Sequence, residues 1–144
     1  MKKILVGIDC SPRSDEVLGA AVRLARALDA RLHLFRGVGV PREVPAIAWS
    51  VAPGELESVL EREALAELNE HARQVPAELL AGTSVALGSP WQAICEAAKR
   101  ENVDLIIIGS HGFGAVDRVL GTTAAKVVNH TDRSVMVVRA TERL

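Results

Sequence analysis

Five short apolar runs, separated by longer segments of different character, constrain the fold of this chain more than any other feature of its sequence. Two of them contain stretches that are apolar without interruption, at Ile106–Ile108 and Val135–Val138. A strand with one solvated face alternates apolar and polar residues, so continuous runs are typical of strands covered by helices on both faces. We therefore expect buried strands at Ile4–Ile8, Leu32–Phe35, Thr83–Leu87, Val103–Ile108 and Ser134–Arg139.

The segments between these runs carry helix signals. Ser11-Pro12 predicts a helix start, because serine caps helices and proline suits the first helical turn. Ser89-Pro90 repeats this signal, and the helix that it opens ends near Lys99-Arg100, whose charges suit a helix C-terminus. Two further helices are predicted, one from about Glu55 and one from near Gly121-Thr122 to about Asn129.

Alternation of strands and helices predicts an α/β protein with right-handed crossovers. The chain has 144 residues, of which 49% are apolar and only 3% aromatic. A chain of this length suits one compact core, so we expect a single domain over residues 1–144. The predicted architecture is an open five-stranded parallel sheet with helices on both faces, a Rossmann-like fold.

Charge and hydropathy exclude several classes of protein. The formal net charge of −1 supplies no field for gathering polyanions, so a general nucleic-acid binder is not expected. Apolar runs fall far short of the roughly 20 residues that a membrane-spanning helix needs, and Met1-Lys2-Lys3 leads straight into a strand, without a signal peptide. Cys10 and Cys95 have no metal-site or disulfide spacing. We expect a cytoplasmic protein that makes no use of membranes.

Polar and glycine-rich residues follow two of the predicted strands. Asp9-Cys10-Ser11 comes after the first, and Gly109–Gly114 after the fourth, ahead of a helix start at Gly121–Thr123. Ligands of such sheets bind outside the carboxyl ends of the strands. Glycines allow close main-chain approach, and helix-start amides carry partial positive charge, so the pattern predicts phosphate binding. A glycine-rich turn that merely connects two elements remains the alternative.

Other phosphate-site classes lack their defining residues. The chain has no Gly-x-x-x-x-Gly-Lys-Ser/Thr sequence, and no Gly-x-Gly-x-x-Gly follows the first strand, which disfavours Walker-type ATPases and nicotinamide dehydrogenases. A receiver domain would need a phosphate-accepting Asp at the end of the third strand. Leu87-Gly88 stands there instead.

From end to end, the sequence resembles the universal stress proteins (UspA-like), of the adenine nucleotide alpha hydrolase-like group of α/β folds. The resemblance is carried by Lys3–Asp9 with Ser11, Asp104–Gly109, the glycine loop, Gly121-Thr122 and Ser134–Arg139. Gly109, Gly112 and Gly121-Thr122 are similar to the motif of ATP-binding members. Eight residues separate Gly112 from Gly121, one fewer than in that motif.

The resemblance implies a set of nucleotide-contacting residues. Asp9 and the Gly7-Ile8 main chain would border base and ribose, and Gly37-Val38 would close the adenine side. The floor of the pocket and its phosphate end would comprise Ile108, Gly109, His111, Gly112, Gly121, Thr122 and Thr123.

Several side chains near this predicted site have alternative interpretations. Asp9 could instead cap the first helix or hold Mg²⁺ through water, and His111 could be a solvated loop residue. Trp49 lies in a long loop of the kind that often forms a lid. Arg118 and Lys126 are the cations nearest in sequence to the glycine residues, and either could meet phosphate or form an exposed salt bridge.

The resemblance implies a stress-response protein that binds ATP, ADP or AMP, with Mg²⁺ as an accompanying cation. Two alternatives stay open: a nucleotide-free stress protein acting through protein contacts, and a slow Mg²⁺-dependent ATPase. Hydrolysis is disfavoured because no positioned base beside an arginine or lysine clamp is evident. The last strand, Ser134 to Arg139, is apolar and suits a sheet edge. We therefore expect a homodimer through this strand, as the resemblance also implies.

Overall fold

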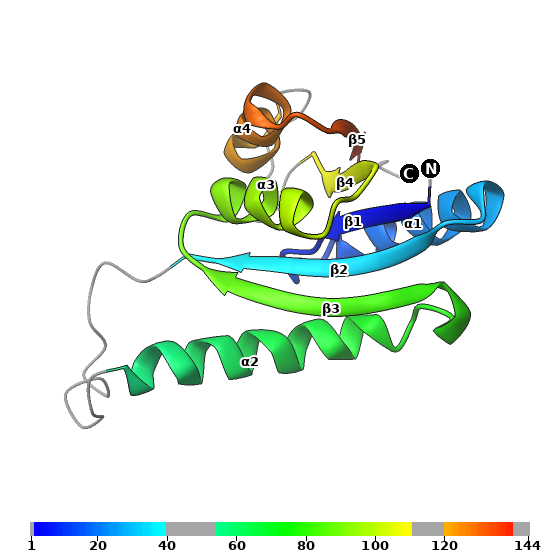
Figure 1. The fold of residues 1–144 in the computed structure, drawn as a ribbon. Coiled ribbons are helices and arrows are strands. Elements are labelled where there is room, and N and C mark those ends of the chain that lie inside the picture. Colours follow the sequence, from blue (N-terminus) through cyan, green and yellow to red (C-terminus); the bar gives the residue numbers. More distant parts are fainter. Residues whose placement is uncertain (1, 40–53, 111–119, 140–144) are drawn as a thin grey trace.

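The computed structural model describes residues 2–39, 54–110 and 120–139. Strands and helices alternate along these ranges in the predicted manner (Figure 1). In chain order the elements are β1 (Lys3–Gly7), α1 (Ser14–Leu28), β2 (Arg31–Val38), α2 (Glu55–Ala72), the 3₁₀ turn η2 (Ala77–Leu79), β3 (Leu80–Leu87), α3 (Pro90–Arg100), β4 (Leu105–Gly109), α4 (Thr122–His130) and β5 (Ser134–Val138).

The five strands form one parallel sheet in the order β3-β2-β1-β4-β5. The chain therefore builds outward from β1 to β3 on one side, and then crosses to β4 and β5 on the other. The direction of winding reverses between β1 and β4, and ligand crevices of open α/β sheets lie at such a reversal. The predicted fold class is confirmed.

Helices cover both faces of the sheet, with α2 below it and α3 and α4 above it in Figure 1. Side chains of β1 alternate between two cores. Ile4 and Val6 pack with residues of α1 and α2, whereas Leu5 packs with residues of α3 and α4. All three are fully buried. Burial on both faces explains why the strands are continuously apolar. None of the helices within the described ranges is long and apolar enough to cross a bilayer.

The start of α1 differs from the prediction. The Ser11-Pro12 signal predicts a helix start at these residues, but α1 begins at Ser14 with Arg13 as its N-cap residue. The Ser14 amide donates to the Ser11 carbonyl oxygen (3.0 Å), which makes a turn ahead of the helix. Asp9 Oδ1 accepts from the Ser11 amide (2.9 Å) and from Ser14 Oγ (3.3 Å). The aspartate thus organises a separate turn, and the helix follows it.

Histidine 33 places a titratable side chain in the interior. It lies on β2, is 7% exposed, and its Nε2 is 2.7 Å from Ser84 Oγ on β3. Burial lowers the pKa of His33, and the positive charges of Lys3 and Arg100 act in the same direction, whereas Glu101 opposes them. The folded protein therefore favours the neutral imidazole.

We expect the free energy of unfolding to decrease as the pH falls through about 6.5, because the unfolded chain binds a proton there that folded His33 resists. Each unit of pKa lowering corresponds to about 1.4 kcal/mol. The stabilisation is complete above the unfolded pKa and is lost as pH falls towards the folded one. Urea titrations between about pH 5.5 and 7.5 should show this slope.

The His33→Gln variant should show a flatter pH dependence than the native protein. Ser84→Ala is the matched control, because it removes the hydrogen-bond partner but keeps the buried imidazole, and it should retain the slope. An equal slope in His33→Gln and the native protein would assign the dependence to another group.

Candidate functional site

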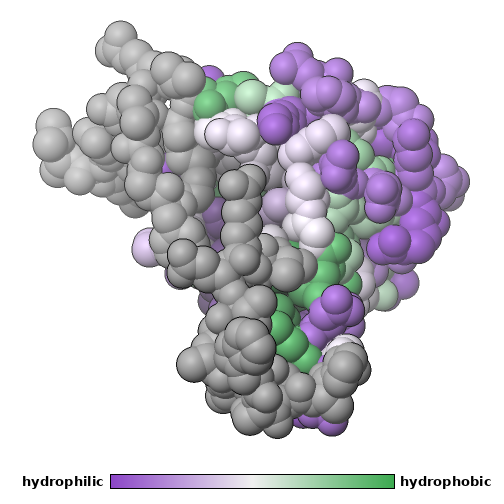
Figure 2. Space-filling view, turned by 90° about the vertical axis from the view of Figure 1, so that its left-hand side faces the viewer, coloured by the Kyte–Doolittle hydropathy of each residue, from purple (hydrophilic) through white to green (hydrophobic). Residues whose placement is uncertain are grey.

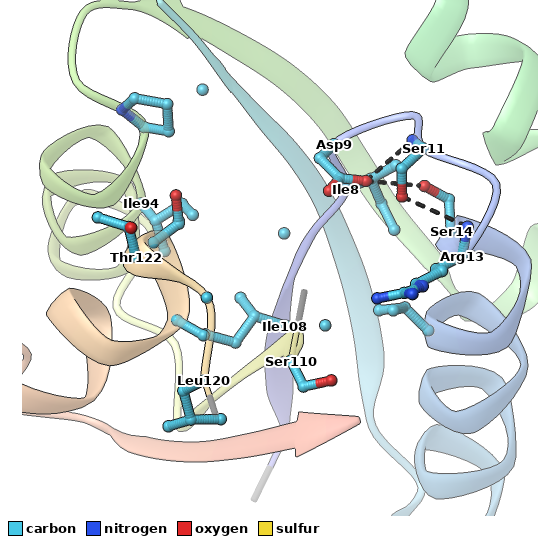
Figure 3. A pocket seen from close by; sticks show the side chains of 18 of the residues that line it. Ile8, Asp9, Ser11, Arg13, Ser14, Ile94, Ile108, Ser110, Leu120 and Thr122 are labelled. Atoms are coloured by element: carbon cyan, nitrogen blue, oxygen red, sulfur yellow. Dashed lines mark hydrogen bonds between the residues drawn. The ribbon is translucent and has the colours of Figure 1, made fainter. Parts of the chain in front are cut away.

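A cavity of about 680 Å³ lies at the carboxyl edge of the sheet, at the reversal between β1 and β4. Figure 2 looks onto this edge, where apolar residues (green) are exposed between the hydrophilic surface and the residues drawn in grey. The described residues that line the cavity come from the ends of β1, β2 and β4 and the starts of α1, α3 and α4 (Figure 3). They are Gly7, Ile8, Asp9, Ser11, Arg13, Ser14, Val17, Phe35, Gly37, Pro90, Ile94, Ile108, Gly109, Ser110, Leu120, Gly121, Thr122, Thr123 and Ala124.

Most of the residues proposed from the sequence meet at this cavity. Those that line it are Gly7, Ile8, Asp9, Gly37, Ile108, Gly109, Gly121, Thr122 and Thr123. Val38 is not among the lining residues. Its carbonyl oxygen accepts the Gly88 amide at 2.8 Å, and side chains alternate along β2, so Val38 and Gly37 face opposite sides of the sheet. His111 and Gly112 lie outside the described residues, as do Trp49 and Arg118.

Asp9 has a structural task at the mouth of the cavity. One carboxylate oxygen, Oδ1, accepts the two hydrogen bonds from Ser11 and Ser14 described above. The side chain is exposed at the same time, so its second oxygen, Oδ2, is the one with room for a ligand hydroxyl. Within the described ranges, no group of three or more His, Cys, Asp or Glu side chains could hold a metal ion. Mg²⁺ that accompanies a nucleotide is held mostly by phosphate oxygens and water, with one or two carboxylates from the protein. Among the described lining residues, Asp9 is the carboxylate that could hold such an ion.

The start of α4 presents main-chain donors to the cavity. Gly121 is the N-cap residue, and its amide donates to the Ser110 carbonyl oxygen at 2.7 Å. The Gly121 carbonyl oxygen accepts the first hydrogen bond of the helix, from the Ala125 amide (3.0 Å). The amides of residues 122–124 lie in the first turn, where amides have no carbonyl partner within their own helix. All three residues line the cavity, and such a helix start is suited to binding an anion.

Two glycines at the cavity are required by packing. A Cβ on Gly7 would lie 2.9 Å from Ile108 Cγ2 and 3.4 Å from Ile94 Cδ1. A Cβ on Gly37 would lie 2.8 Å from the main-chain Cα of Pro90. At Gly37, β2 approaches the main chain of α3, and at Gly7, β1 approaches the Ile108 side chain on β4. These contacts explain both glycines without a ligand.

Cys10 follows Asp9 but is not among the cavity-lining residues. Its φ of 59° lies in the left-handed region, which favours glycine. The side chain packs against the core on the α1 and α2 side. Burial raises the pKa of the Cys10 thiol despite the nearby Arg36 guanidinium. The thiol therefore behaves as a small apolar side chain beside the site.

Sequence reasoning missed the residues that helix starts bring to the cavity. Arg13, at the start of α1, and Pro90 and Ile94, on α3, all line it. Lys126, one of the two cations considered from the sequence, instead has its Nζ 5.7 Å from the centre of the Trp91 ring. A usable signal existed, because any helix start that directly follows a parallel strand lies at the carboxyl edge of the sheet.

Together, the parallel sheet, its reversal between β1 and β4 and the cavity at the carboxyl edge define a Rossmann-like α/β protein with a ligand crevice. The family model for the universal stress protein family matches residues 1–139. Universal stress protein A homolog 2 of Coxiella burnetii is 36% identical over 140 residues, covering 96% of this chain and 94% of the homologue. The chain belongs to the universal stress protein family.

Solved structures of universal stress proteins share this fold. UspA from Lactobacillus plantarum matches with a TM-score of 0.72 and 26% identity, over 96% of this chain and 97% of that one. A universal stress protein in complex with cAMP matches with a TM-score of 0.69 and 23% identity, over 97% and 98%. A family member from Arabidopsis thaliana with AMP bound matches with a TM-score of 0.63 and 16% identity, over 98% and 93%.

Proposed function

We propose that the cavity binds an adenine nucleotide, AMP, ADP or ATP, and that the protein acts in a stress response as a nucleotide-binding module. The observation that carries this proposal is that one cavity combines two kinds of lining. The first-turn amides and threonine hydroxyls of α4 line it, and so do apolar side chains such as Pro90 and Ile94. An anion and an apolar ring are the two ligand parts that such a lining suits.

The complexes of structural neighbours with cAMP and AMP support an adenine nucleotide as the occupant. The volume of about 680 Å³ falls within the range of roughly 300–1,000 Å³ that is usual for small-molecule sites. The glycine loop, one residue shorter than the ATP-binding motif, lies largely outside the described residues. Comparing the affinities for AMP and ATP therefore tests whether this shorter loop changes the number of phosphates that the protein prefers.

Binding without rapid hydrolysis is the activity that the described side chains favour. Phosphoryl transfer needs a base or water-positioning group together with cationic clamps on the transferring group. Of the described lining residues, only Asp9 and Arg13 are charged, and Asp9 Oδ1 already accepts two hydrogen bonds. Slow turnover with Mg²⁺ remains measurable as phosphate release in the same samples.

Calorimetric titration of the ligand-free native protein with AMP, ADP and ATP, with and without Mg²⁺, tests the proposal. We expect heat of binding and an increase in the melting temperature with ligand concentration, because a ligand that binds only the folded state stabilises it. If millimolar nucleotide gave neither effect, the nucleotide-free alternative, in which the protein acts through protein contacts, would be favoured.

We also propose that two copies of the chain associate through β5. This strand lies at one edge of the sheet, and its apolar residues Val135–Val138 are all partly exposed. The Val138 carbonyl oxygen points towards β4 and accepts a hydrogen bond from the Ser110 amide at 2.9 Å. Along a strand, the amide and carbonyl of successive residues point to opposite sides. Those of Val135 and Val137 therefore point away from β4, towards the open edge. An edge of this kind pairs readily with a second copy.

Val137→Pro should convert the dimer into a monomer, because it removes an amide that points to the open edge. The amides of β5 that bond to β4 are kept. Light scattering at micromolar concentration measures the mass. Val137→Thr keeps both the amide and the branched side-chain shape, and it should remain dimeric. A monomeric native protein, or a proline variant that stays dimeric, would contradict association through this edge.

A further inference from the structure

Arg13 occupies a position where an arginine is unfavourable for the helix. It is the N-cap residue of α1, with φ −90° and ψ −5°, and it makes no side-chain capping bond. Helix starts carry a partial positive charge, which disfavours a cation. Serine, threonine or aspartate at this position would instead accept amide hydrogen bonds. The arginine thus works against the local stability of α1, and such local conflicts are typical of functional positions.

The guanidinium points into the cavity. Figure 3 shows Arg13 extending from the start of α1 towards the interior, and Thr122 lies on the opposite wall. The Arg13 main-chain amide donates to Ser11 Oγ at 3.3 Å. Its guanidinium, however, forms no ion pair with any carboxylate of the described ranges. The positive charge therefore faces the space that a ligand would fill.

Arg13 supplies the positive charge of the described lining, and the lack of an ion pair within the described residues leaves its guanidinium available for an anion. Asp9 is the other charged residue among the described lining residues, and its Oδ1 is held by Ser11 and Ser14. The amides at the start of α4 approach the cavity from the wall opposite Arg13. A phosphate chain placed between the two walls would meet main-chain donors on one side and a guanidinium on the other. Guanidinium groups bind phosphate oxygens through paired, charge-assisted hydrogen bonds.

We propose that Arg13 binds the phosphates of the nucleotide and makes affinity depend on phosphate charge. This inference rests on the proposed nucleotide function. The ligand class follows from it: nucleotides with an extended anionic phosphate chain are preferred over the uncharged nucleoside, and Arg13 supplies that preference.

The test compares Arg13→Gln with the native protein by calorimetric titration against adenosine, AMP, ADP and inorganic tripolyphosphate. Arg13→Gln should weaken AMP and ADP binding by about tenfold or more, as expected for a lost charge-assisted hydrogen bond. Adenosine affinity should not change, and added salt should weaken ADP binding less in the variant than in the native protein. Arg23→Gln, on the exposed part of the same helix, is the matched control and should behave like the native protein.

A second readout separates binding from folding. Ligand-free Arg13→Gln should melt at the same temperature as the native protein or higher, because a cation is removed from the start of α1. Arg13→Lys keeps the positive charge but not the planar guanidinium that donates paired hydrogen bonds. Its ADP affinity should lie between those of the native protein and Arg13→Gln.

The outcomes separate this inference from the proposed function. Equal ADP binding by the native protein and Arg13→Gln overturns the role of Arg13 and leaves nucleotide binding intact. Arg13-dependent binding of tripolyphosphate without nucleotide binding supports the role of Arg13 and overturns the nucleotide proposal. A variant that loses adenosine and ADP equally assigns Arg13 a structural role, and a native protein that binds none of the probes overturns both proposals.

Discussion

Thr122→Glu is expected to lower the affinity for AMP by about a hundredfold without destabilising the fold. Thr122 is exposed and lines the cavity at the first position of α4. A carboxylate about 5 Å from a phosphate charge costs about 3 kcal/mol at an effective dielectric constant near 20, which corresponds to about a hundredfold in affinity. The same carboxylate interacts favourably with the helix start, by about 0.5 kcal/mol. Calorimetry and thermal melting of one preparation measure both effects.

The neutral variant Thr122→Gln is the matched control, because it has the size of glutamate without its charge. It should lose only the contribution of the hydroxyl, a few-fold in affinity at about 1 kcal/mol or less. If glutamate and glutamine variants bound AMP equally well, the phosphate would not lie at the start of α4. The cavity would then have to hold its ligand in another orientation.

Gly37→Ala should destabilise the protein by about 2 kcal/mol, within the usual range for overpacking. The added Cβ would lie 2.8 Å from Pro90 Cα and 3.1 Å from its carbonyl oxygen. Both are main-chain atoms of α3, so the strain cannot be relieved by rotating a side chain. β2 is also paired with β1 and β3 on its two sides, which restricts its movement. Equilibrium urea denaturation should show a lower midpoint, and the melting temperature should fall by about 8 °C.

Gly39→Ala provides the control two residues further along. A Cβ at Gly39 would meet no atom of the described residues within 4 Å, so this substitution should change the free energy of unfolding by less than about 0.5 kcal/mol. Equal stability of the two alanine variants would mean that α3 moves away from β2 at little cost. In that case Gly37 would not be explained by packing.

The architecture was predictable because strands that are buried on both faces have continuous apolar sequences. Boundaries were less accurate where pairing, rather than residue type, extends a strand. β3 begins at Leu80, ahead of the predicted Thr83, because Leu80 and Gly82 pair with β2 in spite of the low strand preference of glycine. The α1 start moved because Asp9 makes its own turn with Ser11 and Ser14, a side-chain interaction that competes with capping.

The strand-end residues of the site were predictable from one rule, that the carboxyl ends of parallel strands share an edge. This rule predicts that Asp9, Gly109 and Gly121 lie together. Proximity to the glycine residues along the chain does not identify Arg13, which lies far from them in sequence. α1 directly follows β1, so its start lies at the same edge of the sheet as Asp9. Only the structure shows that the Arg13 side chain extends into the cavity.

Ser110 connects the two parts of the molecule for which functions are proposed. Its carbonyl oxygen accepts from Gly121 at the start of α4, and its amide donates to Val138 on β5. A single residue therefore links the start of α4, which we propose to face the anion, to the outer strand. If occupancy of the crevice shifts that helix, the outer strand is the first neighbour to register the shift. Ligand affinity and subunit association should accordingly be measured on the same samples. If binding of ligand changes the association constant, association must change the ligand affinity by the same factor.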